Sequence, residues 1–260
     1  MIYSGDPAFI TGRALIRTAN MHNQVGMKVW SAGLFLAELL LAVPHLIAER
    51  HVVELGAGTG CTGLIAALSS PSPLSVTMTD FHGDVLENLQ HNIDMNRKCN
   101  NKMCELYCQQ LDWMQCYRSE ITSSEVFSSL GLAHGTAPVV LAADCCYAED
   151  LCGILLHVVS LLLQSSSDRT ESRSDDKPAV GLIATMVRNP DTYAHFEKCL
   201  ATEENLCHRD ITEWALAATE LGGGYNGHFQ PMFYYDGRDA IKLVCVAMKS
   251  EDIDNFLGTL

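Results

Sequence analysis

The sequence has little positive charge and lacks the long apolar runs of membrane proteins. It contains 17 Lys and Arg against 31 Asp and Glu, a formal net charge of -14 in 260 residues. Such a surface repels phosphate backbones, so we expect no nucleic-acid partner. No apolar run reaches the roughly 18 residues of a membrane span, and the first residues lack the basic and apolar regions of a signal peptide. We therefore expect a cytoplasmic protein that does not bind membranes.

A C-x-x-C motif is also absent, although the sequence contains 11 cysteines. The odd number and the missing motif predict reduced thiols of an intracellular protein. Four cysteines lie between Cys99 and Cys116, but their gaps are irregular, whereas zinc ligands usually come in closely spaced pairs. The histidines show no H-E-x-x-H spacing. Buried or surface thiols are the favoured interpretation, zinc is the alternative, and we expect no metal.

Strand-like and helix-like apolar patterns alternate from Val52 to Leu200, which predicts an α/β, Rossmann-like, doubly wound and mostly parallel sheet. One domain spans residues 25–260 and follows an N-terminal lead-in over 1–24. Residues 117–138 are Ser- and Gly-rich and predict an irregular connection, and 165–178 predict a disordered loop within the domain. The predicted strands are RHVVELG, LSVTMTD, MCELYCQQLDW, VVLAADCCY and AVGLIATMVR, followed by a strand-rich end with HRDITEWAL and AIKLVCVAMK.

The stretch VVELGAGTGCTGL places glycines between a strand and a helix. In an open α/β sheet, ligands bind beyond the carboxyl ends of the strands, and glycine lets the backbone approach them. Asp80, which ends the next strand, can accept from ribose hydroxyls. Two registers fit: a G-x-G-x-G motif, or the G-x-G-x-x-G dinucleotide motif that ends at Gly63. NAD and S-adenosylmethionine both match this pattern, and a tight structural turn is the plain alternative.

Charge separates the two cofactors. A dehydrogenase neutralises a pyrophosphate at the helix N-terminus. S-adenosylmethionine carries no phosphate but has an ammonium group, which Glu54, just before the turn, can match directly or through water. S-adenosylmethionine is therefore the favoured cofactor, and a dehydrogenase is the weaker alternative.

Several motifs in order resemble the seven-β-strand methyltransferases that modify protein lysines: VGMKVWSAGLFLAELL, VVELGAGTGCTGL, TDFHGDVLENLQHN, QLDW and AADCCY. Within that family, TDFHGDVLENL, QLDW, VVLAADCCYAED and VRNPDTYAHF are most similar to the members that methylate eukaryotic elongation factor 2. The resemblance covers about Gln24 to Phe196. It implies the class I S-adenosylmethionine-dependent methyltransferase fold with seven strands, and a protein substrate, with elongation factor 2 favoured. We expect a monomer.

The resemblance also implies cofactor contacts at particular positions. A tryptophan in the helix before the first strand flanks the methionine end, a backbone cradle follows that strand, an acid binds the ribose, a tryptophan contacts the adenine, and a small residue ends the fourth strand. These positions are Trp30; Gly56, Ala57 and Gly58; Asp80; Trp113, with Asp112 as support; and Ala143.

Plain structural interpretations remain for several of these residues. Trp30 fits an apolar core, Asp80 fits a helix cap, and Trp113 fits a cover over the sheet edge. Asn88, Asn92 and Asn96 recur on one helix face, where a solvated or capping role is favoured over chemistry.

The D-C-C-Y motif ends the fourth strand and predicts the catalytic residues, Asp144 and Tyr147. A lysine amine must lose a proton before it attacks a methyl group, which costs roughly 4–5 kcal/mol at pH 7. We expect the Asp144 carboxylate to orient the amine and Tyr147 to line the lysine channel. The motif lacks the prolines of the D/N-P-P-Y motif used on nucleic-acid bases, which favours a protein substrate. The alternative for Asp144 is a cap on the helix that starts at Glu149.

Three functions stay open beside methylation of elongation factor 2. They are lysine methylation of another protein, methylation of a small molecule or nucleic acid, and a non-catalytic binding module of the same fold.

Overall fold

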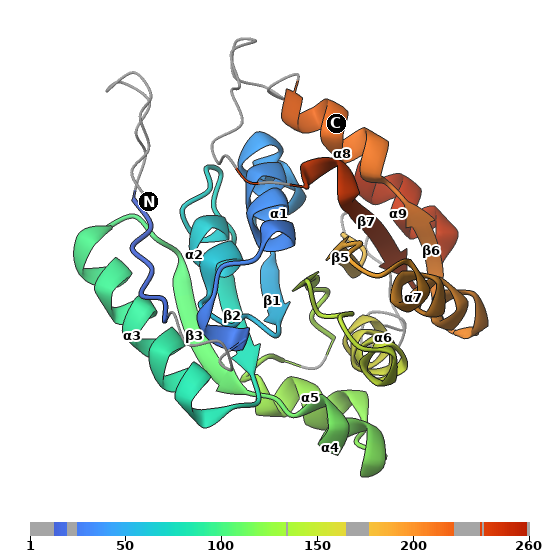
Figure 1. Ribbon diagram of the computed structural model, residues 1–260. Coiled ribbons are helices and arrows are strands. Elements are labelled where there is room, and N and C mark those ends of the chain that lie inside the picture. Colours follow the sequence, from blue (N-terminus) through green and yellow to red (C-terminus); the bar gives the residue numbers. More distant parts are fainter. Residues whose placement is uncertain are drawn as a thin grey trace.

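The structure is a computed structural model that describes residues 13–19, 25–133, 135–164, 177–220, 235 and 237–258 (Figure 1). Most of the predicted loop at 165–178 and most of the 1–24 lead-in lie outside the described residues. Within these ranges, no helix combines the length and apolar character needed to cross a membrane.

Seven strands form one sheet in the order β3-β2-β1-β4-β5-β7-β6. Strands β1 to β5 are parallel, and β7 runs antiparallel to both β5 and β6. This order confirms the predicted seven-stranded, mostly parallel sheet. The strands are β1 (His51–Leu55), β2 (Ser75–Asp80), β3 (Glu105–Gln110), β4 (Val139–Ala143), β5 (Val180–Met186), β6 (Cys207–Asp210) and β7 (Ile241–Ala247).

Helices cover both faces of the sheet, so the central strands are apolar on both sides (Figure 1). In β5, Leu182 and Ala184 belong to one buried core and Ile183 to the other. The first core includes α1 (Ser31–Ala42), α2 (Cys61–Ala66), α3 (Gly83–Cys99), α8 (Thr212–Glu220) and α9 (Ser250–Leu257). The second includes α4 (Trp113–Arg118), α5 (Ser123–Ser129), α6 (Glu149–Gln164) and α7 (Pro190–Thr202).

The structure differs from the sequence prediction in four helices. The strand predicted at MCELYCQQLDW stops at Gln110, and α4 begins at Trp113. The Ser-rich connection contains α5, because Thr122 and Glu125 form a reciprocal capping box and Phe127 is fully buried. The strand predicted at HRDITEWAL stops at Asp210, and the rest forms α8. Helix α9 was not predicted.

An asparagine ladder on α3 holds the extended segment 13–17, which runs beside that helix (Figure 1). Leu15 N–H donates to Asn96 Oδ1 at 2.8 Å, and Asn96 Nδ2 donates back to Leu15 O at 2.7 Å. Asn92 binds Arg17 N and O in the same way, at 2.8 and 3.3 Å. The ladder rungs are Asn88, Asn92, Asn96 and Asn100.

The ladder corrects the prediction that these asparagines are solvated or cap a helix. Asn92 and Asn96 are fully buried, because each amide supplies the donor and acceptor that an unpaired extended backbone needs. Asn92 Nδ2 also donates to Thr59 O at 2.9 Å. The ladder therefore connects the extended segment 13–17 to the glycine turn.

We expect Asn92→Ala to lower the free energy of unfolding by about 1–3 kcal/mol, because it leaves the Arg17 N–H and the buried Thr59 carbonyl without their Asn92 partner. Asn100→Ala is the matched control. Asn100 makes the same two contacts with the backbone of Arg13 but is only half-buried, so water replaces them. Urea unfolding of both variants checks this, and equal losses would contradict it.

Candidate active site

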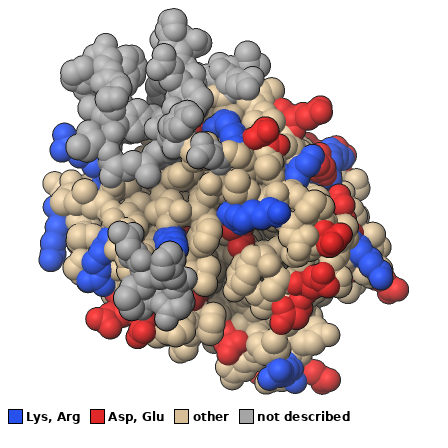
Figure 2. All heavy atoms as spheres, viewed as in Figure 1, with Lys and Arg blue, Asp and Glu red and all other residues tan. Residues whose placement is uncertain are grey.

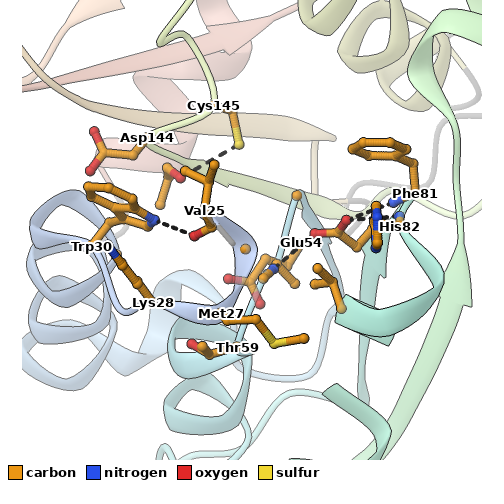
Figure 3. A pocket seen from close by; sticks show the side chains of 18 of the residues that line it. Val25, Met27, Lys28, Trp30, Glu54, Thr59, Phe81, His82, Asp144 and Cys145 are labelled. Carbon is orange, nitrogen blue, oxygen red and sulfur yellow. Dashed lines mark hydrogen bonds between the residues drawn. The ribbon is translucent and has the colours of Figure 1, made fainter. Parts of the chain in front are cut away.

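A cavity of about 710 Å³ lies at the edge of the sheet where β1, β2 and β4 end (Figure 3). The glycine turn, the loop after β4 and the N-terminal segment 25–30 surround it. All nine predicted site residues line this cavity. They come from positions up to 117 residues apart in the chain, between Trp30 and Tyr147. The parallel sheet brings them together because its strands end at one edge.

Two positions of the glycine turn have no room for a side chain. Gly56 and Gly58 have φ of 61° and 55°, in the left-handed region that favours glycine. A Cβ on Gly58 would lie 2.9 Å from the carbonyl oxygen of Gly26, and one on Gly56 would lie 3.1 Å from the Trp113 ring. The turn therefore requires glycine both for its conformation and for its close approach to the cavity walls.

Asp80 ends β2 and is bound to this turn. Its Oδ2 accepts from Gly58 N–H at 3.1 Å, and its Oδ1 accepts from the backbone N–H groups of Phe81 and His82. The N-cap residue of α3 is His82, so Asp80 does not cap that helix. The two oxygens accept three N–H bonds in all, so Oδ2, which accepts one, keeps a lone pair for a hydroxyl donor from a ligand.

Trp113 presents an unpaired polar atom at the other side of the turn. Its indole Nε1 is buried and has no hydrogen-bond partner. The residue before it, Asp112, accepts from Gln115 N–H at 3.2 Å and caps α4. The ring lies at the start of α4 and lines the cavity.

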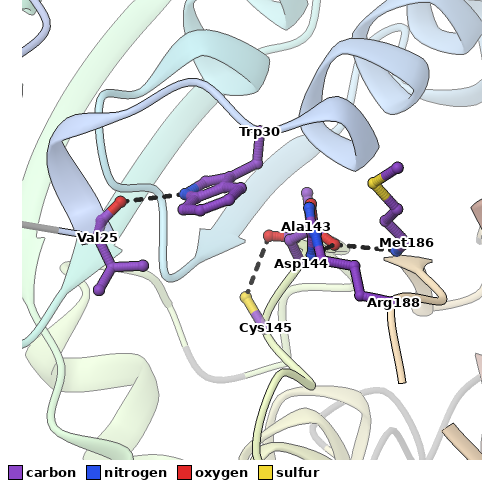
Figure 4. A network of polar contacts seen from close by, with 7 residues as sticks. All are labelled: Val25, Trp30, Ala143, Asp144, Cys145, Met186 and Arg188. Carbon is purple, nitrogen blue, oxygen red and sulfur yellow. Dashed lines mark hydrogen bonds and ion pairs between the residues drawn. The ribbon is translucent and has the colours of Figure 1, made fainter. Parts of the chain in front are cut away.

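Trp30 was predicted within the helix before β1, but it lies one residue before α1 begins. Its indole Nε1 donates to Val25 O at 3.0 Å (Figure 4), and the half-buried ring lines the cavity rather than the core. Ala143 is the last residue of β4 and lines the same cavity.

Glu54 is the only carboxylate on β1 and lies under the turn. It is 3% exposed and accepts from Gly63 N–H at 2.9 Å. Burial raises the pKa of Glu54 to about 8, against smaller lowering effects from hydrogen bonds with Gly63 and Thr62. Near pH 7 this group therefore carries a proton in the free protein.

Asp144 has a left-handed backbone conformation, with φ of 55°. Its Oδ1 accepts from Met186 N–H at 2.9 Å, so the carboxylate joins the ends of β4 and β5 (Figure 4). It does not cap α6. Tyr147 lies three residues further along, 61% exposed, with its side chain on the cavity wall.

Arg188 is a site residue that the sequence analysis missed. Its Nη1 and Nη2 donate to Asp144 Oδ1 and Oδ2 at 3.2 and 3.0 Å, and its guanidinium lies 5.0 Å from the centre of the Trp30 ring. Arg188 follows β5 at the same edge of the sheet as Asp144 follows β4. Its position carries a sequence signal, because ligands bind beyond the carboxyl ends of parallel strands and β5 is one of these strands.

The described parts of the chain contain no cluster of three or more His, Cys, Asp or Glu side chains that could hold a metal ion. The cysteines from Cys99 to Cys116 range from exposed to buried.

The strand order, the antiparallel β7 and the glycine turn beside a large cavity define a class I methyltransferase fold. The family model described as lysine methyltransferase matches residues 11–173. The chain belongs to this lysine methyltransferase family.

Curated relatives agree with the family. An uncharacterised protein of Dictyostelium discoideum is 26% identical over 76% of this chain and 55% of its own length. Protein-lysine N-methyltransferase EEF2KMT of Bos taurus is 31% identical over 72% of this chain and 56% of its own length. The Homo sapiens protein of the same name is 29% identical, over 66% and 48%. The chain thus spans about half the length of the relatives it matches.

Proposed function

We propose that this protein is an S-adenosylmethionine-dependent protein-lysine N-methyltransferase. One observation carries the proposal. One cavity combines a glycine turn of left-handed backbone, an acid at the end of β2 and the Trp113 ring with the Asp144–Tyr147 motif. The first three features suit an adenosyl ligand, and the motif lies where a reacting group must enter.

The residues around the turn fit this cofactor. Asp80 retains acceptor capacity for ribose hydroxyls, and Gly56 and Gly58 leave room for a ligand against the backbone. The Trp113 ring suits an adenine, which offers a flat face for stacking. When bound, S-adenosylmethionine supplies a methyl group on a positively charged sulfur.

The protein's own groups prepare the lysine. Asp144, fixed by Met186 and Arg188, offers its remaining acceptor capacity to the amine and orients it. Tyr147 forms one wall of the approach to Asp144. Such positioning lowers the activation barrier by several kcal/mol. The protected cavity favours the neutral amine.

Charge supports a basic protein segment as the substrate. Glu149 and Asp150 follow Tyr147, and Asp191 follows Arg188, so exposed acids flank both loops of the motif. Figure 2 shows acidic side chains gathered on the right of the view, where Figure 1 places α6 and α7. A lysine within a basic segment of a protein suits this field, whereas a nucleic acid does not.

Within this function we propose elongation factor 2 as the substrate, a cytoplasmic location and a monomeric enzyme. The two mammalian relatives named above carry the name EEF2KMT, and the sequence segments of the lysine motif resemble the members that modify this factor. A lysine of another protein is the alternative outcome of the test below.

The protonated state of Glu54 gives a prediction about cofactor binding. The pKa of Glu54 is raised to about 8, so at pH 7 the free protein holds this proton. An ammonium group bound nearby lowers that pKa, so binding releases up to about one proton at pH 7. Calorimetry with S-adenosylhomocysteine in buffers of different ionisation enthalpy measures the release. Glu54→Gln should abolish it, and release near zero in the natural protein would contradict the assignment.

Labelled methyl transfer into cell extract tests the proposed function. Wild-type protein with labelled S-adenosylmethionine should label a protein band, and Asp144→Ala should not. A band at the mass of elongation factor 2 supports that substrate, whereas another labelled protein rejects it and retains the reaction. Thermal unfolding adds a second readout, because S-adenosylhomocysteine should raise the midpoint and NAD should not. A shift with NAD alone would instead support a dehydrogenase.

A further inference from the structure

Arg188 lies where the main cavity meets a second, smaller cavity of about 80 Å³. Asp144, Tyr147 and Arg188 line both cavities, so together they form the wall between them. Under the proposed function, the target amine meets the methyl group at this wall. The charge of the wall therefore acts directly on both reacting groups.

Two contacts fix the guanidinium of Arg188 in this wall. One is the bidentate ion pair with Asp144, at 3.0 and 3.2 Å, and the other is the face of Trp30 at 5.0 Å. The Asp144 side chain is 4% exposed and that of Arg188 is 42% exposed. A planar guanidinium satisfies both contacts at once, because it donates from its edge and stacks on its face, and no other side chain does both.

An unpaired carboxylate at this position would oppose the reaction. A buried carboxylate binds a protonated lysine as an ion pair and raises the pKa of its amine, which holds it in the unreactive form. When Asp144 is paired with Arg188, its carboxylate still accepts a hydrogen bond from the amine. The ion pair as a whole has no net charge, so it does not favour the ammonium form. We infer that Arg188 is a positioning residue that holds Asp144 in place and cancels its charge where the methyl group is transferred. This inference rests on the proposed function.

The charge balance can be measured without a protein substrate. S-adenosylmethionine and S-adenosylhomocysteine differ only in one methyl group and the positive charge it places on the sulfur. The ratio of their affinities therefore reports the charge around that sulfur. The other charged side chains of the main cavity, Lys28, Glu54, Asp80, Asp84 and Asp112, are common to every variant and cancel in the comparison.

Titration calorimetry with both ligands tests the inference. Arg188→Gln leaves Asp144 unbalanced and should shift the affinity ratio towards S-adenosylmethionine by roughly three- to tenfold. Asp144→Asn leaves Arg188 unbalanced and should shift the ratio the opposite way by a similar factor. Arg188→Lys keeps the positive charge, so its affinity ratio should stay within about twofold of the wild-type ratio.

Arg209→Gln is the matched control, since it removes the same charge from β6, at the far edge of the sheet from β1. Its ratio should equal the wild-type ratio, because exposed charges beyond the Debye length are screened. Should Arg188→Gln fail to fold, the opposite shift in Asp144→Asn still decides the question. Wild-type ratios in both charge variants would overturn the inference alone, whereas a wild-type protein that binds neither ligand would overturn the proposed function with it.

Discussion

Asp144→Ala is expected to lower the methyl-transfer rate by at least about a hundredfold, because the amine loses the carboxylate that orients it for attack. The affinity for S-adenosylhomocysteine should stay within a few-fold, because the contacts proposed for the adenosyl group come from β1, β2 and the start of α4 instead. Single-turnover methyl transfer and titration calorimetry measure the two quantities.

The interpretation of that result depends on a control for folding. Alanine at Asp144 is costly for the backbone, since φ of 55° disfavours alanine by about 1 kcal/mol, and it leaves the Met186 N–H without its acceptor. Asp144→Asn tolerates the left-handed conformation and keeps an acceptor oxygen for Met186. We expect Asp144→Asn to unfold near the wild-type midpoint and still to lose most of its activity. Full activity in either variant would refute the proposed role of the carboxylate.

Gly58→Ala is expected to weaken cofactor binding by at least about tenfold and to destabilise the fold by about 1–3 kcal/mol. Its Cβ would lie 2.9 Å from the Gly26 carbonyl oxygen, which is backbone and cannot rotate away. The turn would have to move, and the Gly58 N–H would then leave Asp80. Both the cradle and the predicted ribose acid would be displaced together. Urea unfolding and calorimetry with S-adenosylhomocysteine measure the two effects.

Gly131→Ala is the control for Gly58→Ala, because Gly131 has a similar backbone conformation but lacks the steric contact. Gly131 has φ of 68°, but a Cβ there would meet nothing within 4 Å. This variant should therefore show only the conformational cost, about 1 kcal/mol, with cofactor affinity unchanged. If both glycine variants bind the cofactor as the wild type does, the close approach of the turn to Gly26 has no functional importance.

Much of the fold could be predicted because its signals are local. The buried strands are short apolar runs that end in glycine or aspartate, and the helices between them show apolar residues at regular spacing. The failures occurred where polar residues form structure. Helix α5 is marked by Thr122 and Glu125, a capping box within a Ser-rich stretch that otherwise indicates a loop. Helix α8 follows a short edge strand, where sequence alone does not locate the boundary.

The site shows a similar division. The glycine turn, Asp80 and the D-C-C-Y motif lie at strand ends, and their placement in one cavity follows from the parallel sheet. Arg188 could not be assigned to Asp144 from spacing, since the two are 44 residues apart in the sequence. Asn92 and its partner Arg17 are separated by 75 residues, and Asn92 binds the backbone of Arg17, which carries no signal in the sequence.

The asparagine ladder has a limited length for geometric reasons. Four residues of helix advance about 6.0 Å, whereas two residues of extended chain advance about 6.6 Å. Successive rungs therefore drift apart by roughly 0.6 Å, or close to 2 Å after three intervals. At the fourth rung the N–H of the next alternate residue, Ala19, donates to Met27 O at 3.0 Å, and Asn88 binds the carbonyl oxygen and Nε of Arg17. The mismatch limits the ladder to a short segment, and sliding that segment by one residue would turn the backbone groups of every rung away from the asparagines.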